Sequence, residues 1–167
     1  MSELLDAVPD RIETAARDLL KTACGKHIAI VTAESCTGGL LASLLTDVEG
    51  ASRAFERGFV VYSDEAKCEL LDIAPATIER CGAVSRETAV AMVRGALQRS
   101  NGDVAVSITG FAGPAAPGDE PGLVHFACQR RGGDMTHREE HFGDIGRGPV
   151  RLRCLDTALA MLGAAIN

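Results

Sequence analysis

Three consecutive residues, Ser35, Cys36 and Thr37, carry side chains that could act as nucleophiles or bind an anion. They follow residues 28–31, an apolar and mostly β-branched run that is typical of a strand buried on both faces. Over residues 40–45 the apolar spacing becomes helical, so the polar residues form a strand-to-helix turn. We therefore expect them in the first turn of a helix, where backbone N–H groups have no partner and point outward.

This turn is suited to stabilise a negatively charged group. Gly38 and Gly39 have no Cβ, so a ligand or another backbone segment can come close. Backbone N–H groups over residues 36–38 are suited to a bound phosphate or to the oxyanion of acyl transfer. The alternative is structural, with Ser35 or Thr37 doing no more than capping the helix.

A serine hydroxyl is a weak nucleophile until a base takes its proton, and Lys67 is the candidate base. Lys67 follows Tyr62, the expected end of a strand, and lies about one turn into a short helix that begins near Asp64. Both side chains could reach one pocket. A lysine serves as a base only if burial or a neighbouring cation lowers its pKa from about 10.4. The alternative is a solvated helix lysine beside a half-buried strand tyrosine.

The histidines and cysteines give weaker signals. Residues 137–141 fit the H-x-x-E-H pattern of a zinc-peptidase class, but that pattern requires a helix. These residues follow a Gly-Gly turn and alternate in a way that favours a strand, so we expect no metal. The cysteines show no metal-ligand spacing, and only Cys36 is weighed as a nucleophile; they are Cys24, Cys36, Cys68, Cys81, Cys128 and Cys154.

Length and composition indicate one globular domain over residues 1–167, with 46% apolar residues and a net charge of −6. The negative charge gives no reason to expect a nucleic acid or an anionic membrane as a partner. No apolar run reaches membrane-spanning length, and the first ten residues lack the pattern of a signal peptide. We expect a cytoplasmic protein.

Helices and strands alternate along most of the chain, which predicts a three-layer α/β/α sandwich around a mixed sheet. Ligands of such sheets bind beyond the carboxyl ends of the strands, so one crevice could hold both the turn at 35–39 and the loop at 109–113. Helices are expected over 9–24, 40–45, 64–71, 75–81, 86–99 and 150–165, and strands over 28–31, 55–62, 103–109, 123–129 and 135–142.

Four motifs, taken together, resemble the CinA C-terminal domain family, which is also known as the nicotinamide-nucleotide amidohydrolases. The resemblance covers nearly all of residues 10–165, and the motifs occur in the family's order and spacing. It implies an α/β/α fold and an enzyme without metal or cofactor that converts nicotinamide mononucleotide and water into nicotinic acid mononucleotide and ammonia. It also implies a homo-oligomer. The motifs lie at residues 32–39, 57–67, 82–85 and 109–114.

The resemblance also implies roles for individual residues. Ser35 would be the nucleophile, activated by Tyr62 and Lys67. Where the family has a compact Gly-Asp-Arg-x-x-Val-Arg run, this chain has a longer segment, so Arg147 and Arg151 both stay open as contacts for the substrate phosphate. Other predicted substrate contacts are Gly39, Thr109, Gly110, Ala112 and Gly113.

Two alternatives use the same crevice. One is a non-catalytic protein that binds or senses a nucleotide. The other is a serine–lysine hydrolase of a different small amide.

Overall fold

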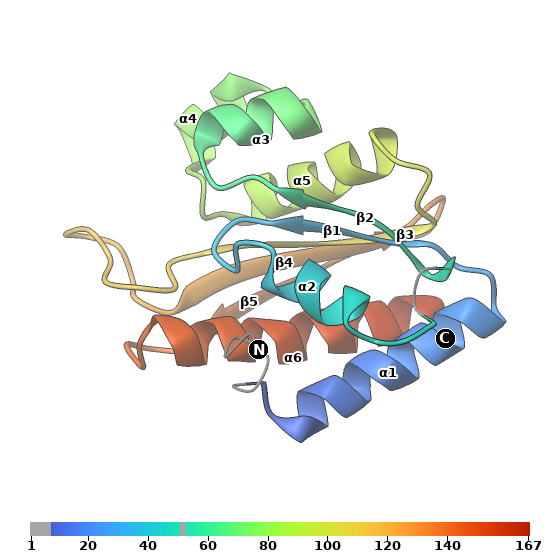
Figure 1. Cartoon of the computed structure of the whole chain (residues 1–167). Helices are drawn as coiled ribbons and strands as arrows, with labels where there is room; N and C mark the ends of the chain where they lie inside the picture. Colours follow the sequence, from blue (N-terminus) through green and yellow to red (C-terminus); the bar gives the residue numbers. More distant parts are fainter. Residues whose placement is uncertain (1–7, 51–52) are drawn as a thin grey trace.

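The computed structural model of the chain describes residues 8–50 and 53–167 and is built on a five-stranded mixed sheet (Figure 1). The strands are β1 (Ile30–Glu34), β2 (Phe55–Val60), β3 (Val104–Gly110), β4 (Leu123–Arg130) and β5 (Met135–His141). Their order in the sheet is β2-β1-β3-β4-β5. β1 pairs in parallel with β2 and β3, whereas β4 and β5 form the predicted antiparallel hairpin.

Helices cover both faces of this sheet. Figure 1 shows α3, α4 and α5 on one side and α1, α2 and α6 on the other. This arrangement confirms the predicted α/β/α sandwich. The helices are α1 (Asp10–Gly25), α2 (Leu40–Thr46), α3 (Asp64–Leu71), α4 (Pro75–Cys81), α5 (Arg86–Gln98) and α6 (Arg147–Ile166).

The two central strands, β1 and β3, explain why the sheet needs both helical layers. All residues of β1 and nearly all of β3 are buried, and successive side chains point to opposite faces. Ile30 and Val106 belong to the apolar core that also contains residues of α1, α2 and α6. Val31 and Ala105 belong to the core that contains residues of α3 and α5. Burial on both faces is what their apolar composition predicts.

Several boundaries differ from the sequence-based expectation, and three of them bear on the pocket. β1 continues to Glu34 because its pairing with β2 and β3 extends to that residue, although Thr32 and Glu34 are polar. β2 ends at Val60, so Tyr62 lies beyond the strand. α6 begins at Arg147, ahead of the predicted residue 150, because a proline in the first turn of a helix needs no N–H partner.

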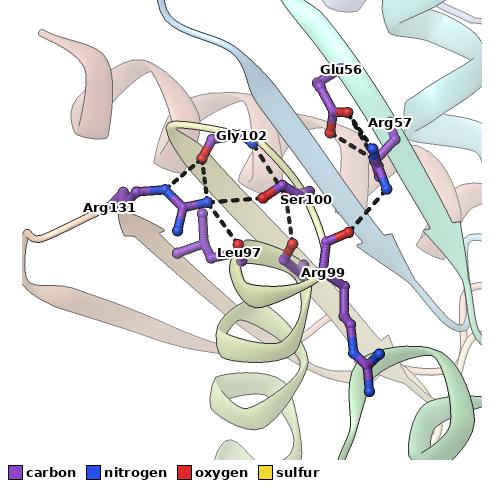
Figure 2. A network of polar contacts seen from close by, with 8 residues as sticks. Glu56, Arg57, Leu97, Arg99, Ser100, Gly102 and Arg131 are labelled. Carbon is purple, nitrogen blue, oxygen red and sulfur yellow. Dashed lines mark hydrogen bonds and ion pairs between the residues drawn. The ribbon is translucent and has the colours of Figure 1, made fainter.

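Two arginine side chains bind backbone carbonyl groups at the end of the sheet opposite to the carboxyl ends of the parallel strands (Figure 2). Arg131 donates hydrogen bonds to the carbonyl oxygens of Leu97 (2.7 Å), Ser100 (3.2 Å) and Gly102 (2.8 and 3.0 Å). Arg57 donates to the Arg99 carbonyl at 3.0 Å. These bonds satisfy carbonyl groups at the end of α5 and in the loop that follows it.

Over the residues described here, no helix is both long enough and apolar enough to cross a membrane.

Candidate active site

The carboxyl ends of β1 and β3 meet in a pocket of about 260 Å³. Its position is the one predicted for a ligand site in such a sheet. The pocket brings together most of the predicted site residues, from four separate segments of the chain. These are Ser35 and Cys36, Tyr62 and Lys67, Thr109, Gly110, Ala112 and Gly113, and Arg147. Thr37, Gly38 and Gly39 lie behind Ser35 and Cys36 and do not line it.

The segment at 35–39 is a turn ahead of α2. The expectation that Ser35 to Thr37 form the first turn of this helix is wrong, because α2 begins at Leu40. The Ser35 N–H donates to the Ile108 carbonyl of β3 at 2.9 Å, and the Gly38 N–H donates to the Ser35 carbonyl at 3.1 Å. Gly38 and Gly39 have positive φ angles of 60° and 92°, which glycine adopts without the strain of a side chain.

The first N–H groups of α2 are bound by the carboxylate of Glu34. Its oxygens accept hydrogen bonds from the backbone N–H groups of Gly39 (3.2 Å), Leu41 (3.0 Å) and Ala42 (2.8 Å). Neither Ser35 nor Thr37 caps the helix. Its N-cap residue is Gly39, which has no side chain to accept a hydrogen bond. The N-terminus of α2 is therefore bound by a group of the chain itself, and of the predicted oxyanion donors at residues 36–38, Gly38 is bound to the Ser35 carbonyl.

One backbone N–H group of the turn, that of Cys36, is left for a ligand in the pocket. The N–H groups of Gly38 and Gly39 bind acceptors within the chain. Those of Cys36 and Thr37 have no acceptor among residues 8–50 and 53–167. Of the two, Cys36 lines the pocket beside Ser35, whereas Thr37 is 0% exposed and does not. The Cys36 N–H is therefore the group that could receive an oxyanion formed at Ser35.

Lys67 is buried in the pocket wall, with only 1% of its surface exposed. Its Nζ donates to the carbonyl oxygens of Tyr62 (3.3 Å) and Ser63 (3.4 Å) and lies 3.7 Å from Oδ1 of Asp64. Burial lowers the pKa of Lys67, and the Asp64 carboxylate opposes that shift. The interpretation as a solvated helix lysine is thus wrong. No hydrogen bond joins Nζ to the Ser35 hydroxyl in the described part of the chain.

Tyr62 lies at the mouth of the pocket and is 66% exposed. The expectation that it ends β2 is wrong, and so is the alternative of a half-buried strand residue. Its carbonyl, and not its phenol, contacts Lys67. A role of the phenol in proton transfer stays a prediction.

Two arginines of α6 have different positions relative to the pocket. Arg147 lines it, and its guanidinium lies so close to Gly113 that a Cβ there would be 2.9 Å from Cζ. Arg151 donates a hydrogen bond of 2.5 Å to the Thr37 carbonyl and does not line the pocket. Of the two arginines, Arg147 is therefore the one that lines the pocket.

The opposite wall is formed by Ala83 and Val84, together with Thr109. The Thr109 hydroxyl donates to the Ala83 carbonyl at 2.7 Å, so it holds this wall in place. Ser85 caps α5 by accepting from the Thr88 N–H at 3.1 Å. Sequence reasoning missed Ala83 and Val84 as site residues, although the motif at 82–85 contains them.

Asp64 and Glu34 were also missed. The position of Asp64, three residues before Lys67 on a helix, is a signal that could have identified it. Glu34 follows an apolar run and was interpreted as part of the turn.

The H-x-x-E-H segment is strand β5, as predicted, and not a helix. Nδ1 of His125 lies 3.1 Å from Nε2 of His137, and His141 contacts Glu120 and Glu139. Within the described residues, no group of three or more histidine, cysteine or acidic side chains is arranged to hold a metal ion.

The turn with Ser35 and the buried Lys67 both lie at the carboxyl edge of a mixed sheet. The model of the CinA C-terminal domain family matches residues 12–166, so the chain belongs to this family. Nicotinamide-nucleotide amidohydrolase PncC of Escherichia coli is 45% identical over 136 residues, which cover 80% of this chain and 81% of PncC. A CinA-like protein of Chlorobium limicola is 50% identical over 152 residues. These cover 88% of this chain but 34% of that relative, so the chain spans about a third of its length.

Solved structures of related proteins have the same fold. Competence/damage inducible protein CihA from Agrobacterium tumefaciens superposes with a TM-score of 0.94 at 43% identity, covering 100% of both chains. A CinA superfamily protein from Escherichia coli superposes with a TM-score of 0.85 at 35% identity, covering 90% of this chain and 88% of the other.

Proposed function

We propose that this chain hydrolyses the carboxamide of nicotinamide mononucleotide to give nicotinic acid mononucleotide and ammonia. The observation that carries the proposal is the buried Lys67, whose pKa is lowered, in the same pocket as Ser35. A lysine with a lowered pKa can be neutral and act as a base for a hydroxyl group. The name of the PncC relative, a nicotinamide-nucleotide amidohydrolase, supports the choice of substrate.

In the first step, Ser35 Oγ attacks the carboxamide carbon and neutral Lys67 takes the hydroxyl proton. The carbonyl oxygen becomes an oxyanion, which the N–H group of Cys36 binds. The C–N bond then breaks. Lys67 returns its proton to the leaving nitrogen, which departs as ammonia, and the acyl group stays on Ser35 as an ester.

In the second step, water attacks this ester while Lys67 again accepts a proton. The acid is released, and the Ser35 hydroxyl regains its proton from Lys67. Every proton transfer uses a side chain of the pocket. We therefore propose that the reaction needs neither a metal nor a cofactor.

The substrate phosphate is the second group that the pocket has to bind. Arg147 is the pocket's arginine, and a guanidinium binds phosphate oxygens through two parallel hydrogen bonds. The backbone of Gly110 to Gly113 lies beside it and leaves room for a close approach. We assign the phosphate to Arg147 and this loop.

The test is ammonia release from nicotinamide mononucleotide by the purified chain, with and without a chelator. We expect turnover that the chelator does not change. Ser35→Ala should lower kcat by about 10³-fold or more, as for loss of a nucleophile that acts with its base as a unit, while calorimetry still detects the bound nucleotide. Binding without any ammonia would favour a nucleotide sensor. Faster turnover of another small amide would favour a different serine–lysine hydrolase.

A further inference from the structure

The turn that carries Ser35 is held by a buried carboxylate that lies outside the pocket. Glu34 is the last residue of β1 and is 0% exposed. Both of its oxygens accept hydrogen bonds: Oε2 from the Thr37 hydroxyl (2.6 Å), from Gly39 N–H and from Leu41 N–H, and Oε1 from Ala42 N–H. It makes no ion pair with any of the described residues.

The Glu34 carboxylate is stabilised by hydrogen bonds from N–H and O–H groups and, within the described residues, by no positively charged partner. These bonds constrain the backbone. A buried carboxylate costs free energy unless hydrogen bonds replace its water, so each of the four donors has to stay in place. Two donors, those of Thr37 and Gly39, belong to the turn. The other two belong to the first residues of α2. Glu34 thus joins the turn to the helix that follows it.

The N–H group of Cys36, which has no acceptor among the described residues, lies between two such anchors. On one side, the Ser35 N–H is bound to the Ile108 carbonyl of β3. On the other side, the Thr37 hydroxyl and the Gly39 N–H are bound to Glu34. The backbone between these points includes Gly38, which has no Cβ and can therefore change its φ and ψ angles easily if an anchor is lost.

We infer that Glu34 is a positioning residue for acyl transfer: its carboxylate fixes the turn so that the Ser35 hydroxyl and the N–H group of Cys36 face the same carbonyl group. It contacts neither the substrate nor the reacting atoms. The inference rests on the proposed function. A shift of about 1 Å in such a turn can cost about 100-fold in rate, because attack requires aligned reacting atoms.

The variant that tests this is Glu34→Gln, which keeps the size of the side chain but turns one oxygen into a donor that faces N–H groups. We expect kcat to fall about 30-fold while KM changes less than about threefold, because the pocket walls that bind the nucleotide stay in place. The matched control is Asp103→Asn. Asp103 also accepts a backbone N–H, that of Ala29 at 2.7 Å, but lies at the opposite end of the sheet. Its kcat should stay at the wild-type value.

Thr37→Val provides a second route if Glu34→Gln does not fold. It removes one donor to Glu34 and keeps the branched shape, and it should lower kcat in the same sense by a smaller factor. A kcat of Glu34→Gln within twofold of the wild type overturns the inference. An equal loss in Asp103→Asn also overturns it, since the effect would then be general destabilisation.

Failure of the proposed function has a different signature, namely no ammonia from the wild-type chain. Amide hydrogen exchange then decides the inference. Faster exchange at Leu41 and Ala42 in Glu34→Gln, and not in Asp103→Asn, supports a carboxylate that holds the turn. Unchanged exchange rates overturn it.

Discussion

Lys67 and Asp64 form an ion pair of 3.7 Å in which the amine is buried and the carboxylate is exposed. The two residues lie one helical turn apart in α3. Burial lowers the pKa of Lys67, and the negative charge of Asp64 partly restores it. The balance between these two effects decides how much of the amine is neutral at a given pH and therefore, in the proposed mechanism, how much of the enzyme is active.

Asp64→Asn should shift the acid limb of the kcat/KM profile to lower pH. Removing the carboxylate removes the charge that favours protonated Lys67, so its pKa falls further and the neutral base persists in more acidic solution. The measurement is the rate of ammonia release across a pH series. Glu65→Gln, on the neighbouring position, is the control and should leave the limb in place. A shift to higher pH would show that Lys67 is not the base.

Gly113→Ala should weaken binding of the phosphate. A Cβ at this position collides with the guanidinium of Arg147, which then has to move. We expect KM for nicotinamide mononucleotide to rise about tenfold, which corresponds to one charge-assisted hydrogen bond of roughly 1.5 kcal/mol. For nicotinamide riboside, which lacks the phosphate, KM should not change. Gly163→Ala is the control, because an added Cβ there meets no atom within 4 Å. Equal increases for both substrates would contradict the assignment of Arg147.

Arg131→Ala should destabilise the fold without affecting the chemistry. The variant loses four hydrogen bonds to three carbonyl groups at the end of the sheet opposite the pocket (Figure 2). We expect the free energy of unfolding to fall by about 1–3 kcal/mol, measured by urea denaturation, with kcat unchanged at 25 °C. Arg130→Ala should have little effect, since that exposed side chain makes no hydrogen bond within the described residues. Equal losses in the two variants would refute this explanation.

Acid should weaken the fold through a histidine pair. Burial lowers the pKa of both His125 and His137 from 6.5. These histidines therefore bind protons more tightly in the unfolded chain than in the folded chain. Their contribution to the free energy of unfolding is complete above about pH 6.5 and is lost as the pH falls below it. Phenylalanine in place of His125 should flatten this dependence between about pH 7.5 and about pH 5.5, as measured by urea denaturation.

His141 provides a comparison of opposite sign. Its pKa is raised by the hydrogen bond to Glu120, so it adds stability in acid that disappears as the pH rises. His141→Gln should steepen the loss in acid. A slope in His125→Phe equal to that of the wild type would exclude His125 as its source.

The positions of Ser35 and Lys67 could be predicted because both follow from strand ends. An apolar run that gives way to polar residues marks a carboxyl end, and parallel strands place such ends side by side. The family motifs added the pairing of these two residues. Helix boundaries were predictable to within a few residues for the same reason, because the apolar period is local information.

The use of Glu34 could not be predicted in this way. Its partners are backbone groups of the following turn and helix, and the sequence does not show which side chain reaches them. Which of Arg147 and Arg151 lines the pocket depends on where α6 begins, since the two residues lie one turn apart and contact different neighbours. Tyr62 is exposed because β2 ends at Val60. The hydrogen-bond pairing between β1 and β2 sets that end.

The most direct test of the central claim is to locate the acyl group on the enzyme. The chain is mixed with nicotinamide mononucleotide, quenched in acid within the first turnovers and digested, and the modified peptide is sequenced by mass spectrometry. The account predicts the nicotinoyl mononucleotide group on Ser35, and none in Ser35→Ala. The same group on Cys36, or ammonia release with no acylated peptide at any quench time, would contradict it.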